Sequence, residues 1–156
     1  MPEFNSTQMA AALSGAKFLS GEQGGKTRRF FSRIVFPAGG AINDTVYFGR
    51  LPRGARIVRN SIVVSCAAGT ASSVLDIGTR LTAPPNTVLD ADGIAVGVDI
   101  AAAGQKVPTG AAIGAFLLNG ADDTVQTAEV DVYGTVRVAA PASGQALAVE
   151  FQYSVE

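Results

Sequence analysis

The stretch ALAVEFQYSV, from Ala146 to Val155, carries the clearest structural signal in the chain. Its apolar and polar side chains alternate with a period of two, which is the period of a half-buried β-strand. One face of this strand is therefore expected to be buried and the other to face solvent. The inward residues would be Leu147, Val149, Phe151, Tyr153 and Val155, and the outward ones Glu150, Gln152 and Ser154.

Several other stretches alternate in the same way. In residues 26–36, one face would hold Phe30, Ile34 and Phe36, and the other Arg29, Phe31, Arg33 and Val35. Residues 44–51 and 124–134 also alternate, with Val46 and Phe48 on one face of the first stretch and Val130 and Val132 on one face of the second. Residues 73–79 are a short stretch rich in β-branched side chains, which also favours a strand. Seven to nine short strands at this spacing predict an all-β fold, a β-sandwich or a jelly-roll-like architecture.

The connections are less regular. Residues 55–66 are interpreted as one long strand in which Val58, Ile62, Val64 and Cys66 share a face. The adjacent prolines in residues 79–93 predict a loop. Residues 93–107 fit either a pair of strands or a short helical insert, and residues 109–120 fit a strand weakened by glycine. Residues 135–155 are interpreted as a hairpin that turns at Pro141–Gly144.

Residues 1–25 show no strand pattern and end near the glycine-rich SGEQGGK. We interpret them as an extended N-terminal arm with room for a short helix, and residues 26–156 as one β-sandwich domain. The arm lacks the basic and continuous apolar regions of a secretory signal. No apolar run is long enough for a membrane-spanning helix, so no membrane partner is expected.

The net charge of −1 conceals two halves of opposite sign. Residues 1–59 hold nine basic and three acidic residues (+6), and residues 60–156 hold three basic and ten acidic residues (−7). This split favours self-assembly or docking on a charged partner. It argues against nucleic acid as a partner, because the acidic part would repel phosphates.

Four arginines surround one predicted turn, in GRLPRGARIVRN. If the turn feeds a strand, Arg56 shares a face with Val58 and Ile62, and Arg59 lies on the opposite face. The cluster fits either a solvated turn or an interface that pairs with Asp122, Asp123, Glu129 and Asp131 of a neighbouring copy. The candidate interface residues are Arg28, Arg29, Arg50, Arg53, Arg56 and Arg59.

The residues for catalysis are mostly missing. The chain has no histidine, which excludes Ser/His/Asp and Cys/His nucleophiles and imidazole metal sites. Its single cysteine, Cys66, lies in an apolar run and fits a small buried side chain. The acidic turns at 90–93 and 119–123 lack a complete calcium motif, and the glycine-rich segments lack that of a phosphate loop. No enzyme activity and no cofactor or metal are expected.

Certain motifs resemble a known type of protein. They are the turn DTVYFGRLPRGARIV at Asp44–Val58, the strand VLDIGT at Val74–Thr79, the basic start GGKTRR and the final AVEFQYSV. Together they resemble the small virion structural proteins encoded beside the major capsid gene in tailed bacteriophages. The resemblance runs loosely from about residue 5 to residue 156 and covers no catalytic residues.

This resemblance implies a capsid decoration, or cement, protein on the surface of the virion head. It implies a homo-oligomer, with a trimer favoured, and the phage major capsid protein as the partner. Neck connectors and tail or fibre subunits resemble this type as well, and that alternative stays open. A carbohydrate-binding sandwich is less favoured, because such modules present exposed aromatic rings and this chain has no tryptophan.

Overall fold

The computed structural model describes residues 27–58, 60–114, 126 and 128–155. The proposed N-terminal arm therefore lies outside the described residues. Within them the chain forms nine strands and one short 3-10 helix. In order these are β1 (Thr27–Val35), β2 (Thr45–Leu51), β3 (Ala55–Ile57), β4 (Val63–Cys66), β5 (Val74–Leu81), β6 (Val88–Asp99), β7 (Gly104–Lys106), the 3-10 helix Gly110–Ala112, β8 (Val130–Arg137) and β9 (Ala146–Val155).

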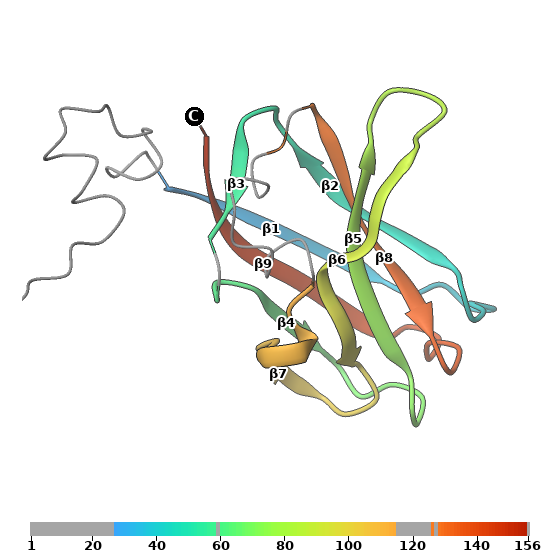
Figure 1. Cartoon of the computed structure of the whole chain (residues 1–156). Helices are drawn as coiled ribbons and strands as arrows, with labels where there is room; N and C mark the ends of the chain where they lie inside the picture. The colour runs from blue at the N-terminus through green and yellow to red at the C-terminus, as the bar shows by residue number, and fades with distance from the viewer. Residues whose placement is uncertain (1–26, 59, 115–125, 127, 156) are drawn as a thin grey trace, which may run out of the picture.

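The strands form two antiparallel sheets, which confirms the predicted β-sandwich (Figure 1). Sheet A has the order β1-β9-β4-β7, with β3 pairing beside β4 on the same edge of β9. Sheet B has the order β2-β8-β5-β6. Strand β9 is the longest-paired member of sheet A, because it carries β1 along one side and both β3 and β4 along the other.

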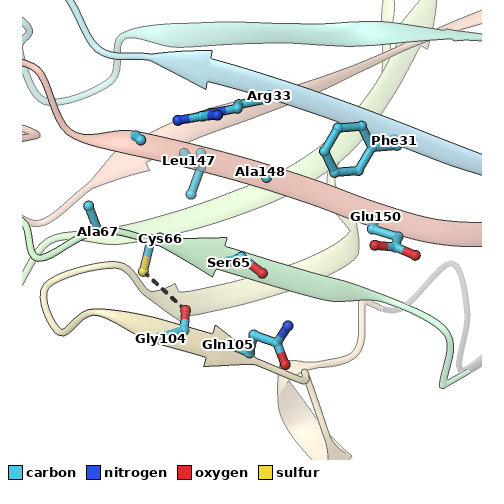
Figure 2. Close-up of a pocket in the computed structure, with 11 residues that line it drawn as sticks. Phe31, Arg33, Ser65, Cys66, Ala67, Gly104, Gln105, Leu147, Ala148 and Glu150 are labelled. Atoms are coloured by element: carbon cyan, nitrogen blue, oxygen red, sulfur yellow. Dashed lines mark hydrogen bonds between the residues drawn. The ribbon is translucent and has the colours of Figure 1, made fainter.

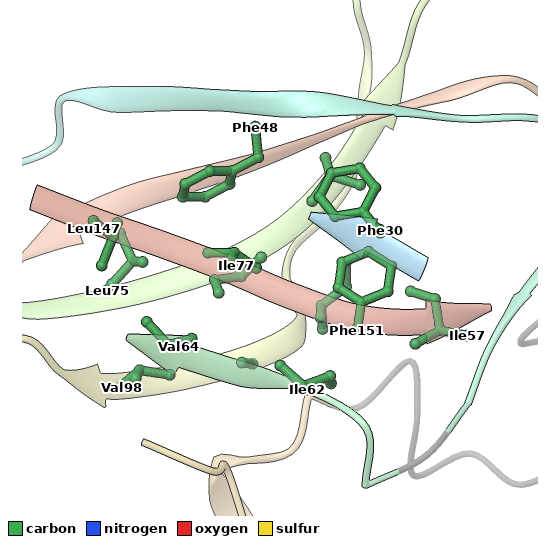
Figure 3. Close-up of a cluster of buried hydrophobic side chains, with 14 of the residues drawn as sticks. Phe30, Phe48, Ile57, Ile62, Val64, Leu75, Ile77, Val98, Leu147 and Phe151 are labelled. Atoms are coloured by element: carbon green, nitrogen blue, oxygen red, sulfur yellow. The ribbon is translucent and has the colours of Figure 1, made fainter. Parts of the chain in front are cut away.

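The core lies between the sheets and follows the alternation read from the sequence (Figure 3). Leu147, Val149 and Phe151 of β9 are at most 1% exposed. Phe151 stacks on Phe30 of β1 with ring centroids 4.5 Å apart and planes 8° from parallel. Stacking of the two rings stabilises the fold beyond what the burial of their apolar surface contributes. It also fixes the register of β1 against β9.

The long strand predicted for residues 55–66 is wrong, because the chain breaks into β3 and β4. Asn60 between them has a φ of 65°, a left-handed conformation that a continuous strand cannot hold. The break changes the phase of the alternation. Ala55 and Ile57 point into the core, and Val58 is 38% exposed rather than buried.

The loop predicted for residues 79–93 is also too long. Strands β5 and β6 pair through most of it, and only residues 82–87 connect them. Pro84 and Pro85 are confined to this tip, where the Asn86 side chain donates hydrogen bonds to the carbonyls of Leu81 and Thr82. Prolines are tolerated there because the tip carries no sheet hydrogen bonds.

Residues 93–107 form strands and not a helical insert, because β6 and β7 cover most of them. Strand β6 is irregular, with shifts in register against β5. Gly78 of β5 makes room for one of them, because a Cβ atom at this position would collide with the backbone of Asp90 and Ala91. The first part of residues 109–120 forms the 3-10 helix, and the rest from residue 115 lies outside the described residues.

The hairpin predicted for residues 135–155 does not exist, because β8 and β9 belong to different sheets. The segment between them crosses the edge of the sandwich instead. Gln145 in this crossing is buried, and its side-chain amide donates hydrogen bonds to the carbonyls of Ala67 and Ile100. Sequence alternation alone cannot separate these two connections, since both need a turn between two strands.

None of the helical segments in the described residues is long and apolar enough to cross a membrane.

We expect Phe151→Ala to lower the free energy of unfolding by about 3–5 kcal/mol, because it removes a fully buried ring and leaves a cavity beside Phe30. Urea denaturation monitored by circular dichroism measures the change. Ile42→Ala is the control, since Ile42 is 49% exposed in a turn and should change stability by less than about 0.5 kcal/mol. Equal losses for the two variants would contradict this core.

Candidate interface surfaces

The arginine turn links the two sheets at one end of the sandwich. It runs from Leu51, the last residue of β2 in sheet B, to Ala55, the first residue of β3 in sheet A. The Ala55 amide donates a hydrogen bond to the Pro52 carbonyl at 3.1 Å, and Gly54 has a φ of 81°. Proline before and glycine after Arg53 suit this turn, so Arg53 is held at its exposed tip.

The other arginines reach the same end by strand pairing. Arg28 and Arg29 lie at the start of β1, opposite Tyr153 and Gln152 of β9. Arg56 of β3 lies opposite Ser154 on the other side of β9. The structure thus places five of the six candidate arginines around one end of the molecule, and Arg59 lies outside the described residues.

The face predicted for Arg56 is wrong. It does not share the inner face with Ile62, because Ala55 and Ile57 on either side of it are the buried residues of β3. Ser154, predicted to be exposed, is only 7% exposed. Strands β1 and β3 both flank β9 at this point, so their side chains cover Ser154 from two sides.

Two of the arginines already have acidic partners within the chain. Arg29 binds both carboxylate oxygens of Glu150, at 2.6 and 2.7 Å, and this hydrogen bonding lowers the pKa of the Glu150 carboxyl. Arg50 contacts Glu129 at 3.1 Å and Asp131 at 3.4 Å. Glu129 and Asp131 were expected to pair with arginines of a neighbouring copy, but both contact Arg50 of their own chain. Asp122 and Asp123 lie outside the described residues.

Asp131 is the centre of a polar network on the outer face of sheet B. Its side chain is 7% exposed, lies 3.5 Å from the guanidinium of Arg80 and accepts a hydrogen bond from the Thr82 hydroxyl at 2.9 Å. Burial without these partners would be costly for a carboxylate. The network therefore holds the ends of β2, β5 and β8 together next to the arginine turn.

A second candidate surface is a shallow trough on the outer face of sheet A, with a volume of about 540 Å³ (Figure 2). Arg33, Ala148, Ser65 and Gln105 are successive partners across β1, β9, β4 and β7, so they form one row on this face. Because the two middle side chains are small and the two outer ones are long, the row dips in the centre.

The rim of the trough is apolar as well as charged. Phe31 of β1, which lines the trough, is 57% exposed. Outside the lining, Val35 of β1 and Val107, directly after β7, are 58% and 52% exposed. Exposed apolar side chains of this size, grouped on one sheet face, indicate a contact surface. The sequence held a signal for it, because Ala146 and Ala148 occupy outward positions of β9 where polar residues would be usual.

Cys66 borders the trough from β4 but is buried, as the sequence predicted. Its thiol donates a hydrogen bond to the Ala102 carbonyl at 3.3 Å, and burial raises the pKa of the thiol. A raised pKa keeps the thiol protonated at neutral pH, so it is a poor nucleophile. Among the described residues, no group of three His, Cys, Asp or Glu side chains could hold a metal ion.

The structure is similar to chains in two solved phage capsids. One belongs to the capsid of Ralstonia phage GP4, with a TM-score of 0.59 and 19% identity over 83% of this chain and 83% of that chain. The other belongs to the capsid asymmetric unit of cyanophage Pam1, with a TM-score of 0.58 and 16% identity over 100% of both chains. This chain shares their fold. No family model matches it, and no curated protein does either.

We expect Asp131→Asn to lower the free energy of unfolding by about 1–3 kcal/mol, because a buried amide would replace the charge that Arg80 and Thr82 bind. Glu129→Gln is the matched control, since Glu129 contacts Arg50 from an exposed position and its loss should be close to neutral. Denaturant unfolding of the three proteins measures this. If Asp131→Asn is as stable as the parent, the network does not hold this end of the sandwich.

Proposed function

We propose that this protein is a structural component of a tailed-phage virion that decorates the outer surface of the head and bridges capsomers. The observation that carries the proposal is the shared fold with a chain of the cyanophage Pam1 capsid, which extends over 100% of both chains. The motifs at Asp44–Val58 and Val74–Thr79 support it, since they form the sheet-linking turn and the centre of sheet B.

In this role the protein would act through its surfaces and catalyse no reaction. Its partners would be other copies of itself, with a trimer favoured, and the major capsid protein. It would need no cofactor, nucleic acid or membrane. A rigid sandwich suits the task, because a protein that bridges shell subunits must hold its contact surfaces at fixed positions.

The arginine end is the proposed contact with the shell. Arg28 and Arg53 are exposed and have no ion pair among the described residues, whereas Arg29 and Arg50 bind acids of their own chain. An arginine fork binds carboxylates in a bidentate manner, so an acidic patch on the shell would fit it. Arg56 and Arg59 extend the proposed contact along the chain after the turn.

Co-sedimentation with phage heads lacking this protein tests the proposal. We expect the purified chain to bind such heads in many copies, with an affinity that falls as salt is raised. Analytical ultracentrifugation of the free protein should give three times the chain mass of 15.9 kDa. A protein that fails to bind heads would overturn the decoration role, and binding at one vertex only would indicate a connector instead.

A charge reversal locates the contact. We expect Arg53→Glu to weaken head binding by about tenfold or more, since it replaces attraction by repulsion at the tip of the turn. The matched control is the double variant Thr45→Glu/Ser143→Glu, which changes the net charge equally but at the far end of β2 and before β9. Equal binding by the two variants would show that the arginine end is not the contact.

A further inference from the structure

The trough on sheet A leaves apolar surface uncovered in the described structure. Phe31 stands beside a floor of small side chains, and Val35 lies next to the trough on β1, opposite Ala146. Arg33, which lines the same side, has no ion pair among the described residues. In Figure 2 the lining side chains come from four neighbouring strands, with Phe31 and Arg33 of β1 on one side and Gly104 and Gln105 of β7 on the other. A linear peptide segment fits such a shape better than a compact ligand does.

The chain itself contains a suitable segment. Residues 13–19, LSGAKFL, hold Leu13, Phe18 and Leu19, with Lys17 as the single charge. We propose that residues 13–19 fold back and lie in the trough of their own chain, antiparallel to β1. Phe18 and Leu19 would contact Phe31, and the small residues at 14–16 would pass over the floor.

The connection has the length that this contact needs. Residues 20–26, SGEQGGK, join the segment to Thr27, where β1 begins. The chain must reverse and return along β1 as far as Phe31, which is four residues, or about 13 Å at the rise of an extended strand. Seven residues with three glycines cover that path and supply the reversal, because glycine accepts the backbone conformations of tight turns.

The chemistry of the segment suits this surface. Its apolar side chains would be removed from water as they pack against Phe31 and Val35. Lys17 can extend its ammonium group to solvent at the open side of the trough. A short tether also gives a high effective concentration, about millimolar, so the chain's own segment outcompetes that of a second copy. This contact would form in the isolated protein and needs no shell partner.

Thiol labelling of the full-length chain tests the contact. In a Cys66→Ala background, Ala148→Cys places one thiol on the floor of the trough, and Thr45→Cys places a reference thiol on exposed β2. Phe18→Asp/Leu19→Asp then disrupts the segment. The matched control, Asn5→Asp/Gln8→Asp, adds the same charge outside it.

We expect Phe18→Asp/Leu19→Asp to raise the maleimide labelling rate of Ala148→Cys by about tenfold, as for a segment that is bound about nine-tenths of the time. The control variant and the reference thiol should show no change, and the protection should survive about a hundredfold dilution. Unchanged labelling in the disrupted variant would overturn the proposal. Protection that disappears on dilution would overturn it too, because the occupant would then be a second copy. Head binding is measured separately, so neither outcome depends on the decoration role.

Discussion

The pairing of β9 with three other strands is the constraint on which the rest of the molecule depends. One side of β9 matches β1 over nine residue pairs, and the other side holds β3 and then β4. A strand fixed on both edges cannot slip by one residue without turning Leu147, Val149 and Phe151 out of the core. The same register places Ala146 and Ala148 on the outer face, so the pattern that builds the core also shapes the trough.

The two outer faces of the sandwich differ in chemistry. Sheet B is closed by a polar network around Asp131, and its strand β8 is buried on both faces for almost its full length. Sheet A is more open, with large apolar and basic side chains of β1 beside a floor of small ones. Arg28 and Arg53, which have no ion pair among the described residues, lie at the end where the turn crosses between the sheets. A protein that works by docking needs such unsatisfied surfaces, whereas its interior must be fully packed.

Local alternation predicted the all-β class, the inward residues of β9 and the two faces of β1, because each depends only on residues within one strand. The errors concern contacts between distant residues. The break at Asn60 changes the phase between β3 and β4, so Arg56 and Ile62 lie on opposite faces. A single asparagine is only a weak local signal for a left-handed residue. Residues 138–145 cross from one sheet to the other, and the Gln145 side chain in this crossing donates hydrogen bonds to the carbonyls of Ala67 and Ile100. These partners are distant in the sequence, so local alternation could not distinguish the crossing from a hairpin. The spacing of the arginines identified them as a cluster. Which of them bind acids of the same chain could not be predicted, because Glu150, Glu129 and Asp131 are distant in the sequence from Arg29 and Arg50.

In the role that we propose, the protein would be a rigid body attached through its surfaces to a larger shell. An electron-microscopy reconstruction of the particle that contains this chain tests it most directly. The account predicts copies of the sandwich distributed over the whole outer surface of the head, with the Arg28 and Arg53 end against the shell. A particle in which the chain is absent from the head surface, or lies there with this end turned to solvent, would contradict it.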